Sequence, residues 1–368
     1  MVSLQQQVGG KIRRLRQIVG DPDRKAARLV AQEVGALLLR GQSPMFYVER
    51  ALYRRGTGDP RGYVTDSEAE QLYALKRRGD GWLRSFNDKV LFDQLFRPSG
   101  LPLPAFLGHT RMGSLVRPDG TGCPLGSRGR LTEVVAGMVG ASPSGGVFAK
   151  PVVANKGTGA LRVTAATLEQ KAGSLYEAVS RDDYLFQEAV RQHDGMAALY
   201  PHSLNTLRVL TGQDAGGGAR VLCAVGRMGS GGATVDNSHA GGLFIGVDLG
   251  TGRLMPYAHR LYGYGGDRFG RHPDTGVQFE GYPVPFFDEA MEVARRAHDW
   301  LPHPYAGWDV GITPDGPVVI EGNAGPHLLS LDVAYGGLKT TPAFRDFLDS
   351  HRIDYAGPET NSPVAGHD

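Results

Sequence analysis

Apolar residues recur at helical spacing through the first 85 residues of the chain. Lys11–Val19 and Asp23–Leu39 carry this pattern, and Asp21-Pro22 is suited to the start of the second helix. Thr65-Asp66-Ser67-Glu68 contains residues that cap the first turn of a helix, so a further helix is expected from that point. We therefore expect residues 1–85 to form a helical N-terminal region.

Beyond residue 85, short apolar segments separated by turns predict strands with a few helices between them. This mixture predicts an α+β fold. The expected helices are 131–140 and Asp288–Leu301, and residues 109–130 are expected to be a Gly- and Arg-rich loop. The expected strands are Ala105–Gly108, Val147–Val153, Leu161–Val163, Tyr184–Val190, Thr206–Leu210, Arg220–Arg227, Gly307–Ile312 and Pro317–Glu321.

The last two strands are joined by a Pro-Asp-Gly turn and form an expected hairpin. If that turn is a three-residue loop, Thr313 pairs with Pro317. Counting along the ladder then places Asp309 opposite Glu321, with Asn323, two residues further on, on the same face.

Two carboxylates this close repel each other and do not both stay ionised without a cation. Oxygen ligands favour a hard divalent ion, above all Mg²⁺, which takes one or two carboxylates and fills its other positions with phosphate oxygens and water. We therefore expect Asp309, Glu321 and Asn323 to bind the metal of a nucleotide triphosphate site. The alternative is a surface hairpin whose polar side chains face water.

Lys150 lies on one expected strand, and the Gly-rich stretch 154–160 follows before the next strand. Such a hairpin can close over phosphates, because glycine allows close approach of the backbone and lysine supplies a point charge. The sequence differs from the phosphate-binding loop G-x-x-x-x-G-K-[ST]. A plain surface hairpin is the alternative.

Gln187, Glu188, Ala189 and Val190 end a short buried strand, where they would connect two subdomains. In a nucleotide site their backbone could read the adenine edge, and Glu188 could accept a hydrogen bond from the ribose or the adenine amine. Arg208 lies on another strand, and an arginine on a rigid strand suits bidentate contact with a phosphate or carboxylate. The alternative is that Arg208 forms an ion pair with a surface carboxylate.

The 368-residue chain has a formal net charge of +2, so its overall charge gives no argument for binding nucleic acid or an anionic membrane. Its two cysteines, Cys123 and Cys223, are in no metal-binding spacing, which favours a reduced, cytoplasmic protein. Polar residues interrupt the N-terminus, so no signal peptide is expected. The longest apolar patch, Ala36–Leu39, is too short to span a bilayer.

The order of these residues resembles the ATP-grasp superfamily, in which two α+β subdomains grip ATP. Over roughly residues 40–340 the chain is similar to the sugar-transfer-associated ATP-grasp family, relatives of glutamate-ligase-like enzymes. The segments that carry the resemblance are Asn87-Asp88-Lys89, Phe148-Ala149-Lys150-Pro151, Ser203-Leu204-Asn205-Thr206-Leu207-Arg208-Val209 and Val319-Ile320-Glu321-Gly322-Asn323. The resemblance implies an ATP-grasp fold beside the helical region, with a small subdomain over 86–190, a large one over 191–352 and a flexible tail over 353–368.

The resemblance also implies a role for each candidate residue. Lys89 and Lys150 would contact the ATP phosphates, with Lys156 in the Gly-rich loop beside them, and residues 187–190 would hold adenine. Arg208 would stabilise the transferring phosphoryl group. The set Asp309, Glu321 and Asn323 would bind Mg²⁺, or else Mn²⁺.

The implied chemistry is carboxylate activation, in which a substrate carboxylate takes the γ-phosphoryl group and an amine then displaces phosphate to leave an amide. The expected partners are a small-molecule carboxylate and an amine, with a homodimer possible and no nucleic acid or membrane. The Gly-rich loops 155–160 and 228–242 would keep water out. The helical N-terminal part departs from the family's usual first subdomain, so the carboxylate site is not defined.

Two rivals use the same residues. One is an ATP-dependent kinase acting on a sugar or another hydroxyl, since the same grip on ATP serves phosphotransfer. The other is a non-catalytic nucleotide-binding protein. The presence of all three metal-type side chains argues against the second rival.

Overall fold

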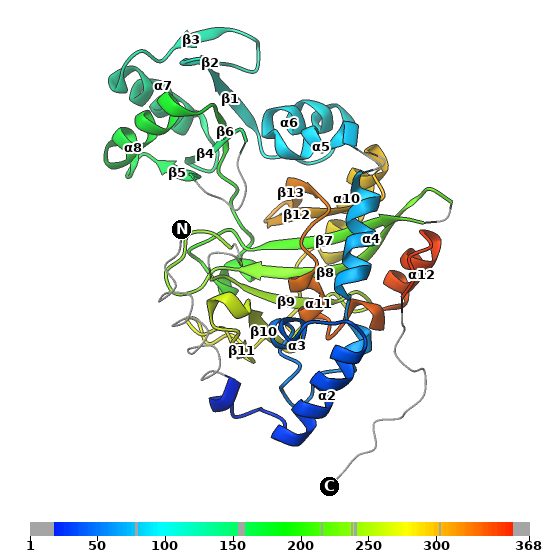
Figure 1. Ribbon diagram of the computed structural model, residues 1–368. Coiled ribbons are helices and arrows are strands. Elements are labelled where there is room, and N and C mark those ends of the chain that lie inside the picture. Colours follow the sequence, from blue (N-terminus) through cyan, green and yellow to red (C-terminus); the bar gives the residue numbers. More distant parts are fainter. Residues whose placement is uncertain are drawn as a thin grey trace.

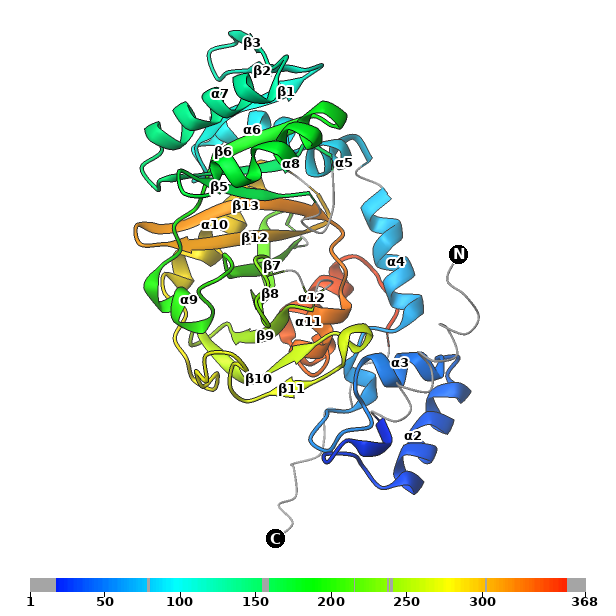
Figure 2. The same cartoon turned by 90° about the vertical axis from the view of Figure 1, so that its left-hand side faces the viewer.

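Two antiparallel sheets form the framework of the protein, and this mixture of helices and sheets confirms the expected α+β fold. Figure 1 shows the smaller sheet above the larger one, with helices α2 (Ala27–Leu39) and α3 (Pro44–Glu49) below both and α4 (Asp66–Arg77) alongside the larger sheet, and Figure 2 shows the same stacking from the side. The computed structural model describes residues 18–77, 80–153, 159–214, 216–236, 238, 241–301 and 303–355.

The smaller sheet has the strand order β3-β2-β1-β6-β4-β5. Its strands are β1 (Phe106–Arg111), β2 (Ser114–Val116), β3 (Gly122–Pro124), β4 (Gly146–Pro151), β5 (Leu161–Thr164) and β6 (Tyr184–Glu188). Helices α7 (Arg128–Ala141) and α8 (Leu168–Arg181) bury their apolar residues against it. The expectation of a loop over 109–130 is wrong, because β2 and β3 pair there at the edge of the sheet.

The larger sheet has the strand order β11-β10-β9-β8-β7-β12-β13. Its strands are β7 (Thr206–Gln213), β8 (Ala219–Met228), β9 (Leu243–Asp248), β10 (Arg253–Arg260), β11 (Arg268–Phe269), β12 (Tyr305–Thr313) and β13 (Gly316–Ala324). Helix α10 (Phe287–Trp300) packs into one buried cluster with this sheet, and α11 (Leu329–Ala334) and α12 (Pro342–Ser350) pack into another. Both faces are therefore covered, and eight of the nine residues of β12 are buried.

Helices α5 (Asp80–Asn87) and α6 (Lys89–Phe96) lie beside the smaller sheet and above β13 of the larger one (Figure 1). Phe86, Phe92 and Phe96 pack with Trp308 in the core of the larger sheet, although residues from 86 onward were assigned to the small subdomain. The expected boundary between residues 85 and 86 also falls inside α5. The two helices present these rings toward the larger sheet.

The N-terminal helices are α2 (Ala27–Leu39), α3 (Pro44–Glu49) and α4 (Asp66–Arg77). The expected start of the second helix at residue 23 is wrong. Arg24 forms a bridge with Arg54, and the Lys25 backbone N–H donates to the Tyr53 carbonyl, so this stretch is not helical. The expected helix over 11–19 lies mostly outside the described residues.

The remaining helical elements include a short helix after the smaller sheet and several 3₁₀ turns. These are α9 (Asp194–Leu199), η1 (Pro60–Gly62), η2 (Arg97–Ser99), η4 (Tyr262–Tyr264) and η5 (Leu338–Thr340). Within the described ranges, no helix has the length and apolar character needed to cross a membrane.

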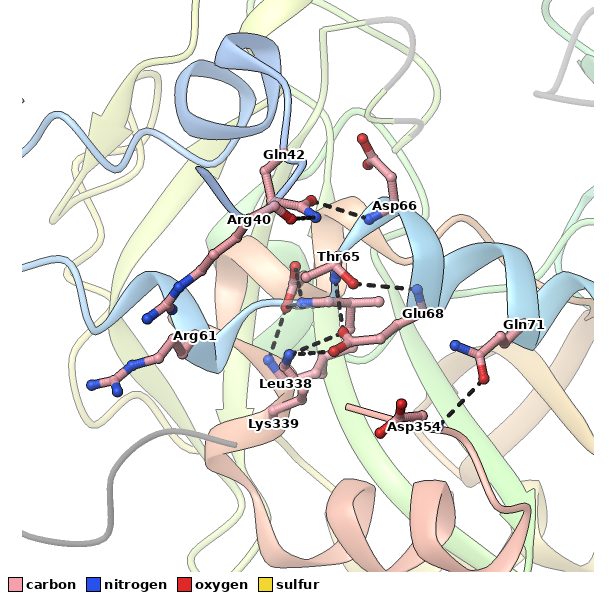
Figure 3. Close-up of polar contacts among 12 residues, drawn as sticks. Arg40, Gln42, Arg61, Thr65, Asp66, Glu68, Gln71, Leu338, Lys339 and Asp354 are labelled. Atoms are coloured by element: carbon pink, nitrogen blue, oxygen red, sulfur yellow. Dashed lines mark hydrogen bonds and ion pairs between the residues drawn. The ribbon is translucent and has the colours of Figure 1, made fainter. Parts of the chain in front are cut away.

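A buried ion pair fastens α4 to the C-terminal part of the chain (Figure 3). The Thr65 backbone N–H donates to Glu68 Oε2 at 2.8 Å and the Glu68 N–H donates to Thr65 Oγ1 at 3.2 Å, which confirms the expected helix start. Lys339 Nζ donates to the same Glu68 carboxylate at 2.7 and 2.9 Å. Both side chains are almost fully buried, so each depends on the other for its charge balance.

We expect Lys339→Met to lower the free energy of unfolding by about 3–5 kcal/mol, because Glu68 would remain buried without a cation. Guanidinium unfolding measures this loss. The double variant Lys339→Met with Glu68→Leu should recover most of it. Arg295→Met is the control, since its partner Glu292 is half exposed and the cost should stay under about 1 kcal/mol. Equal stability of the single and double variants would contradict the prediction.

Candidate functional site

The hairpin of β12 and β13 reaches the expected pairing by an unexpected route. Thr313 pairs with Gly316, so the expected three-residue loop is wrong and the loop has two residues. Thr313 Oγ1 donates to the Gly316 carbonyl at 2.8 Å and accepts from the Asp315 N–H at 3.1 Å, which stabilises the shorter turn. A bulge next to Asp309 then adds one residue to β13, and Asp309 lies opposite Glu321 after all.

Asp309 is held by arginines from two neighbouring strands. Arg208 of β7 donates through Nε to Oδ1 and through Nη2 to Oδ2, the latter at 2.8 Å. Arg227 of β8 donates through Nη1 to Oδ2 at 2.9 Å. Burial by itself would raise the pKa of Asp309, but the two guanidinium groups lower that pKa well below its usual range.

Glu321 and Asn323 complete the expected oxygen set on β13. Burial, and then the charge of Asp309, raise the pKa of Glu321 above its usual value. Asn323 Nδ2 is buried without a hydrogen-bond partner among the described residues. A cation would relieve the repulsion between the carboxylates and would take the Oδ1 oxygen of Asn323 as a ligand, whereas the unpartnered Nδ2 is a donor suited to an anion.

These residues fit a hard divalent ion, with one restriction. No group of three or more His, Cys, Asp or Glu side chains that could hold a metal occurs in the described part of the chain. The amide of Asn323 is therefore needed as a ligand beside Glu321. Asp309 offers only the lone pairs that its two arginines leave unused.

A pocket between the two sheets collects four of the candidate residues. Lys89 comes from the first turn of α6, Lys150 from β4, Gln187 from β6 and Glu321 from β13. Burial lowers the pKa of Lys150 to about 8, against the opposing effect of Glu321, and burial also lowers the pKa of Lys89. Two amines that are costly to keep charged without anions make this pocket suited to phosphate groups.

The expected adenine segment is only partly available. The Glu188 carboxylate accepts from the Ser144 backbone N–H at 2.9 Å, so it is engaged at the end of the smaller sheet. The N–H groups of Glu188 and Ala189 donate to backbone carbonyls of Ala105 and Gly146, and the expected contact of residues 187–190 with adenine stays a prediction. Lys156 lies outside the described residues, and its expected role stays a prediction.

Three further residues belong to the site and were not anticipated. Arg227 of β8 forms a second ion pair with Asp309, and Asp236 Oδ1 lies 3.5 Å from Arg227 Nη2. Asp93, one turn after Lys89 on α6, lines the pocket and accepts from Gln187 Nε2 at 3.5 Å. Asp93 could have been found from the sequence, because it lies four residues after Lys89 and therefore on the same face of the helix. No local pattern marks the other two, because their partners lie on other strands.

The family model of sugar-transfer associated ATP-grasp matches residues 80–341, which is 262 of the 368 residues. The chain belongs to this family. The match confirms the resemblance and the ATP-grasp fold. It begins at the start of α5 and includes both sheets and the hairpin, while α2, α3 and α4 lie outside it.

No curated protein matches the sequence. Among solved structures, the chain is similar to purK, N5-carboxyaminoimidazole ribonucleotide synthetase, in an ADP complex, with 11% identity, a TM-score of 0.40 and coverage of 66% of this chain and 46% of that one. It is similar to the ATP-grasp ligase PsnB complexed with minimal precursor, Mg and ADP, with 15% identity, a TM-score of 0.39 and coverage of 75% and 61%. It is also similar to D-alanyl-alanine synthetase A from Vibrio cholerae, with 14% identity, a TM-score of 0.44 and coverage of 73% of this chain and 64% of that one. The chain thus spans less than two thirds of each of these proteins, and such distant likenesses say nothing of its activity.

Proposed function

We propose that this protein is an ATP-dependent carboxylate–amine ligase that forms an amide or peptide bond through an acylphosphate, on an amino acid, a peptide or a small metabolite. The observation that carries the proposal is the convergence of Lys89, Lys150 and Glu321 on one pocket between the sheets of an ATP-grasp protein. ATP would enter this pocket, with its phosphates against the two lysines and its base toward Gln187.

The proposed reaction has two steps. An oxygen of the substrate carboxylate attacks the γ-phosphorus, the bond to the β–γ bridging oxygen breaks, and ADP leaves. The amine nitrogen then attacks the acyl carbon, the bond from that carbon to the phosphate-bearing oxygen breaks, phosphate leaves with this former carboxylate oxygen, and the amine proton passes to solvent. Lys89, Lys150 and Arg208 neutralise charge on the phosphates and hold them in line with the attacking oxygen.

A divalent cation fits beside these residues. Glu321 and Asn323 would hold it, with the unused lone pairs of Asp309. Mg²⁺ or Mn²⁺, when bound, supplies further neutralisation of the phosphate charge.

The state of Asp309 shows that this carboxylate is not suited to be the base that a hydroxyl acceptor needs. A hydroxyl needs a base to take its proton as it attacks, whereas a carboxylate arrives already ionised. Asp309 is a weak base, because Arg208 and Arg227 hold its pKa low. For the kinase rival, the candidate base in the pocket would be Glu321, whose pKa is raised.

ADP release from Mg·ATP, measured against a panel of carboxylates with and without amines, tests the proposal. We expect ADP and free phosphate only when both co-substrates are present. Glu321→Ala should lower kcat/KM by about a hundred-fold or more, since it removes both a ligand and a counter-charge from the phosphate pocket. Glu292→Ala on the exposed face of α10 is the matched control and should leave the rate unchanged.

Two other results would redirect the assignment. Transfer of phosphate to a hydroxyl acceptor, with no free phosphate, would establish the kinase. ATP binding without ADP release across the whole panel would favour the nucleotide-binding protein without catalysis.

The pKa of Lys150 sets an alkaline limit on ATP binding. The lysine carries its charge below about pH 8 and loses it as the pH rises through that value, so attraction for phosphate falls. We expect ATP affinity, measured by calorimetry, to drop about ten-fold between pH 7 and pH 9, following the protonated fraction. Lys150→Arg should flatten this profile, because arginine stays charged throughout. Parallel profiles for the two proteins would show that another group controls the pH dependence.

A further inference from the structure

The carboxylate of Asp93 lines the pocket between the sheets, while its ionic partner lies toward solvent. The side chain of Asp93 on α6 is 5% exposed, whereas that of Arg97, one turn later, is 42% exposed. Arg97 donates through Nε to Oδ2 at 2.8 Å and through Nη2 to Oδ1 at 2.6 Å. Arg97 Nη2 also donates to the Pro104 carbonyl at 2.9 Å. The carboxylate is therefore held in one orientation, with its charge balanced by Arg97.

Gln187 of β6 lies against this carboxylate in the same pocket. Its backbone is fixed by pairing with Phe148 of β4 and Phe106 of β1, and its Nε2 donates to Asp93 Oδ1 at 3.5 Å. A carboxylate only accepts, so the charge of Asp93 attracts the NH₂ end of the amide and turns Oε1 away. The contact is long for a hydrogen bond, and its effect is the choice between the two amide orientations. Among the described residues no donor reaches Gln187 Oε1, so this oxygen is available to a ligand.

An amide oxygen in this pocket suits a base that donates a hydrogen bond. Adenine carries an exocyclic amine at the position where guanine and hypoxanthine carry a carbonyl. Gln187 Oε1 would accept from the amine, but it would face the carbonyl oxygen as a second acceptor, with the carboxylate of Asp93 behind it. Leu103, Leu185 and Val319 also line the pocket and give apolar surfaces for a planar ring.

We propose that Asp93 is a positioning residue that fixes the amide of Gln187 with its oxygen toward the base, so that the site selects purine triphosphates with an exocyclic amine over those with a carbonyl. Asp93 acts through Gln187 and does not need to touch the nucleotide. The inference rests on the part of the proposed function that places ATP in this pocket, and it is independent of the ligase step. It assigns the base contact to a side chain, whereas the sequence suggested the backbone of residues 187–190.

Nucleotide affinities of the full-length wild type, measured by calorimetry with Mg²⁺ and without co-substrates, test the selection. The three probes are ATP, inosine triphosphate (ITP) and purine riboside triphosphate, whose base lacks the amine. ATP should bind about thirty-fold or more tightly than ITP, because the carbonyl of ITP meets an acceptor. ATP should bind about ten-fold more tightly than purine riboside triphosphate, which loses one hydrogen bond.

Asp93→Asn should lower the ratio of ATP affinity to ITP affinity by about ten-fold or more. The new amide would give its oxygen to Arg97 and its NH₂ group to Gln187, whose own amide would then turn and present NH₂ to the base. Affinity for ITP should therefore rise, which the loss of a merely structural ion pair would not cause. Burial lowers the pKa of Lys150 and the charge of Asp93 opposes this, but that effect reaches both triphosphates alike and leaves the ratio unchanged.

Gln187→Leu tests the same contact without altering the ion pair. It removes the acceptor, so the advantage of ATP over purine riboside triphosphate should fall from about ten-fold to less than about threefold. Asp59→Asn is the matched control, because Asp59 also accepts from one arginine through both oxygens, but in the N-terminal region away from the pocket. It should leave all three affinities unchanged.

The outcomes separate this inference from the proposed function. Equal affinities of the wild type for ATP and ITP, or ratios unchanged in folded Asp93→Asn and in Gln187→Leu, would overturn the inference and leave the ligase untouched. The expected preference for ATP without ADP release on any carboxylate and amine would overturn the ligase and leave the inference standing. A wild type that binds none of the three triphosphates would overturn both.

Discussion

The buried charge of Asp309 is the constraint on which the rest of the site depends. An isolated carboxylate in the interior costs several kcal/mol, and it persists only with cations in good geometry. The strand order β8-β7-β12-β13 supplies them, because it sets Arg208 beside Asp309 and brings Arg227 within reach across one strand. The same order puts Glu321 on the other side of Asp309, where burial and the charge of Asp309 outweigh the opposing charges of Lys150, Arg208 and Lys89 and raise the pKa of Glu321. The excess of negative charge at Glu321 on β13 makes this edge of the sheet suited to a cation.

Much of this site could be predicted from the sequence, because its main elements are local in the chain. The Pro-Asp-Gly turn marks the hairpin, and period-two alternation sets the face. The pairing of Asp309 with Glu321 was predicted correctly although the loop was one residue too long in the prediction, since the bulge on β13 compensates. Lys150 was found for a similar reason, as it stands on a strand directly before a glycine-rich stretch.

What the sequence did not reveal depends on contacts between distant segments. Arg227 and Asp236 carry no motif, and their importance appears only when β8 pairs with β7. Strands β2 and β3 have three residues each and alternate too briefly to differ from a loop of Gly and Arg. The Phe residues of α5 and α6 show that one face is apolar, but not which of the two sheets covers it.

Helix α6 joins the two sheets and carries one of the phosphate-facing lysines with it. Its aromatic face is buried in the core of the larger sheet, whereas Val90 packs with Val152 and Leu185 of the smaller one. The Lys89 N–H donates to the Val152 carbonyl at 3.0 Å, two residues beyond Lys150. Helix α6 therefore ties the strand that carries Lys150 to the core of the larger sheet, with Lys89 at the junction. The two lysines and Glu321 therefore meet where α6 bridges the two sheets, and this bridge places charges from both sheets in one pocket.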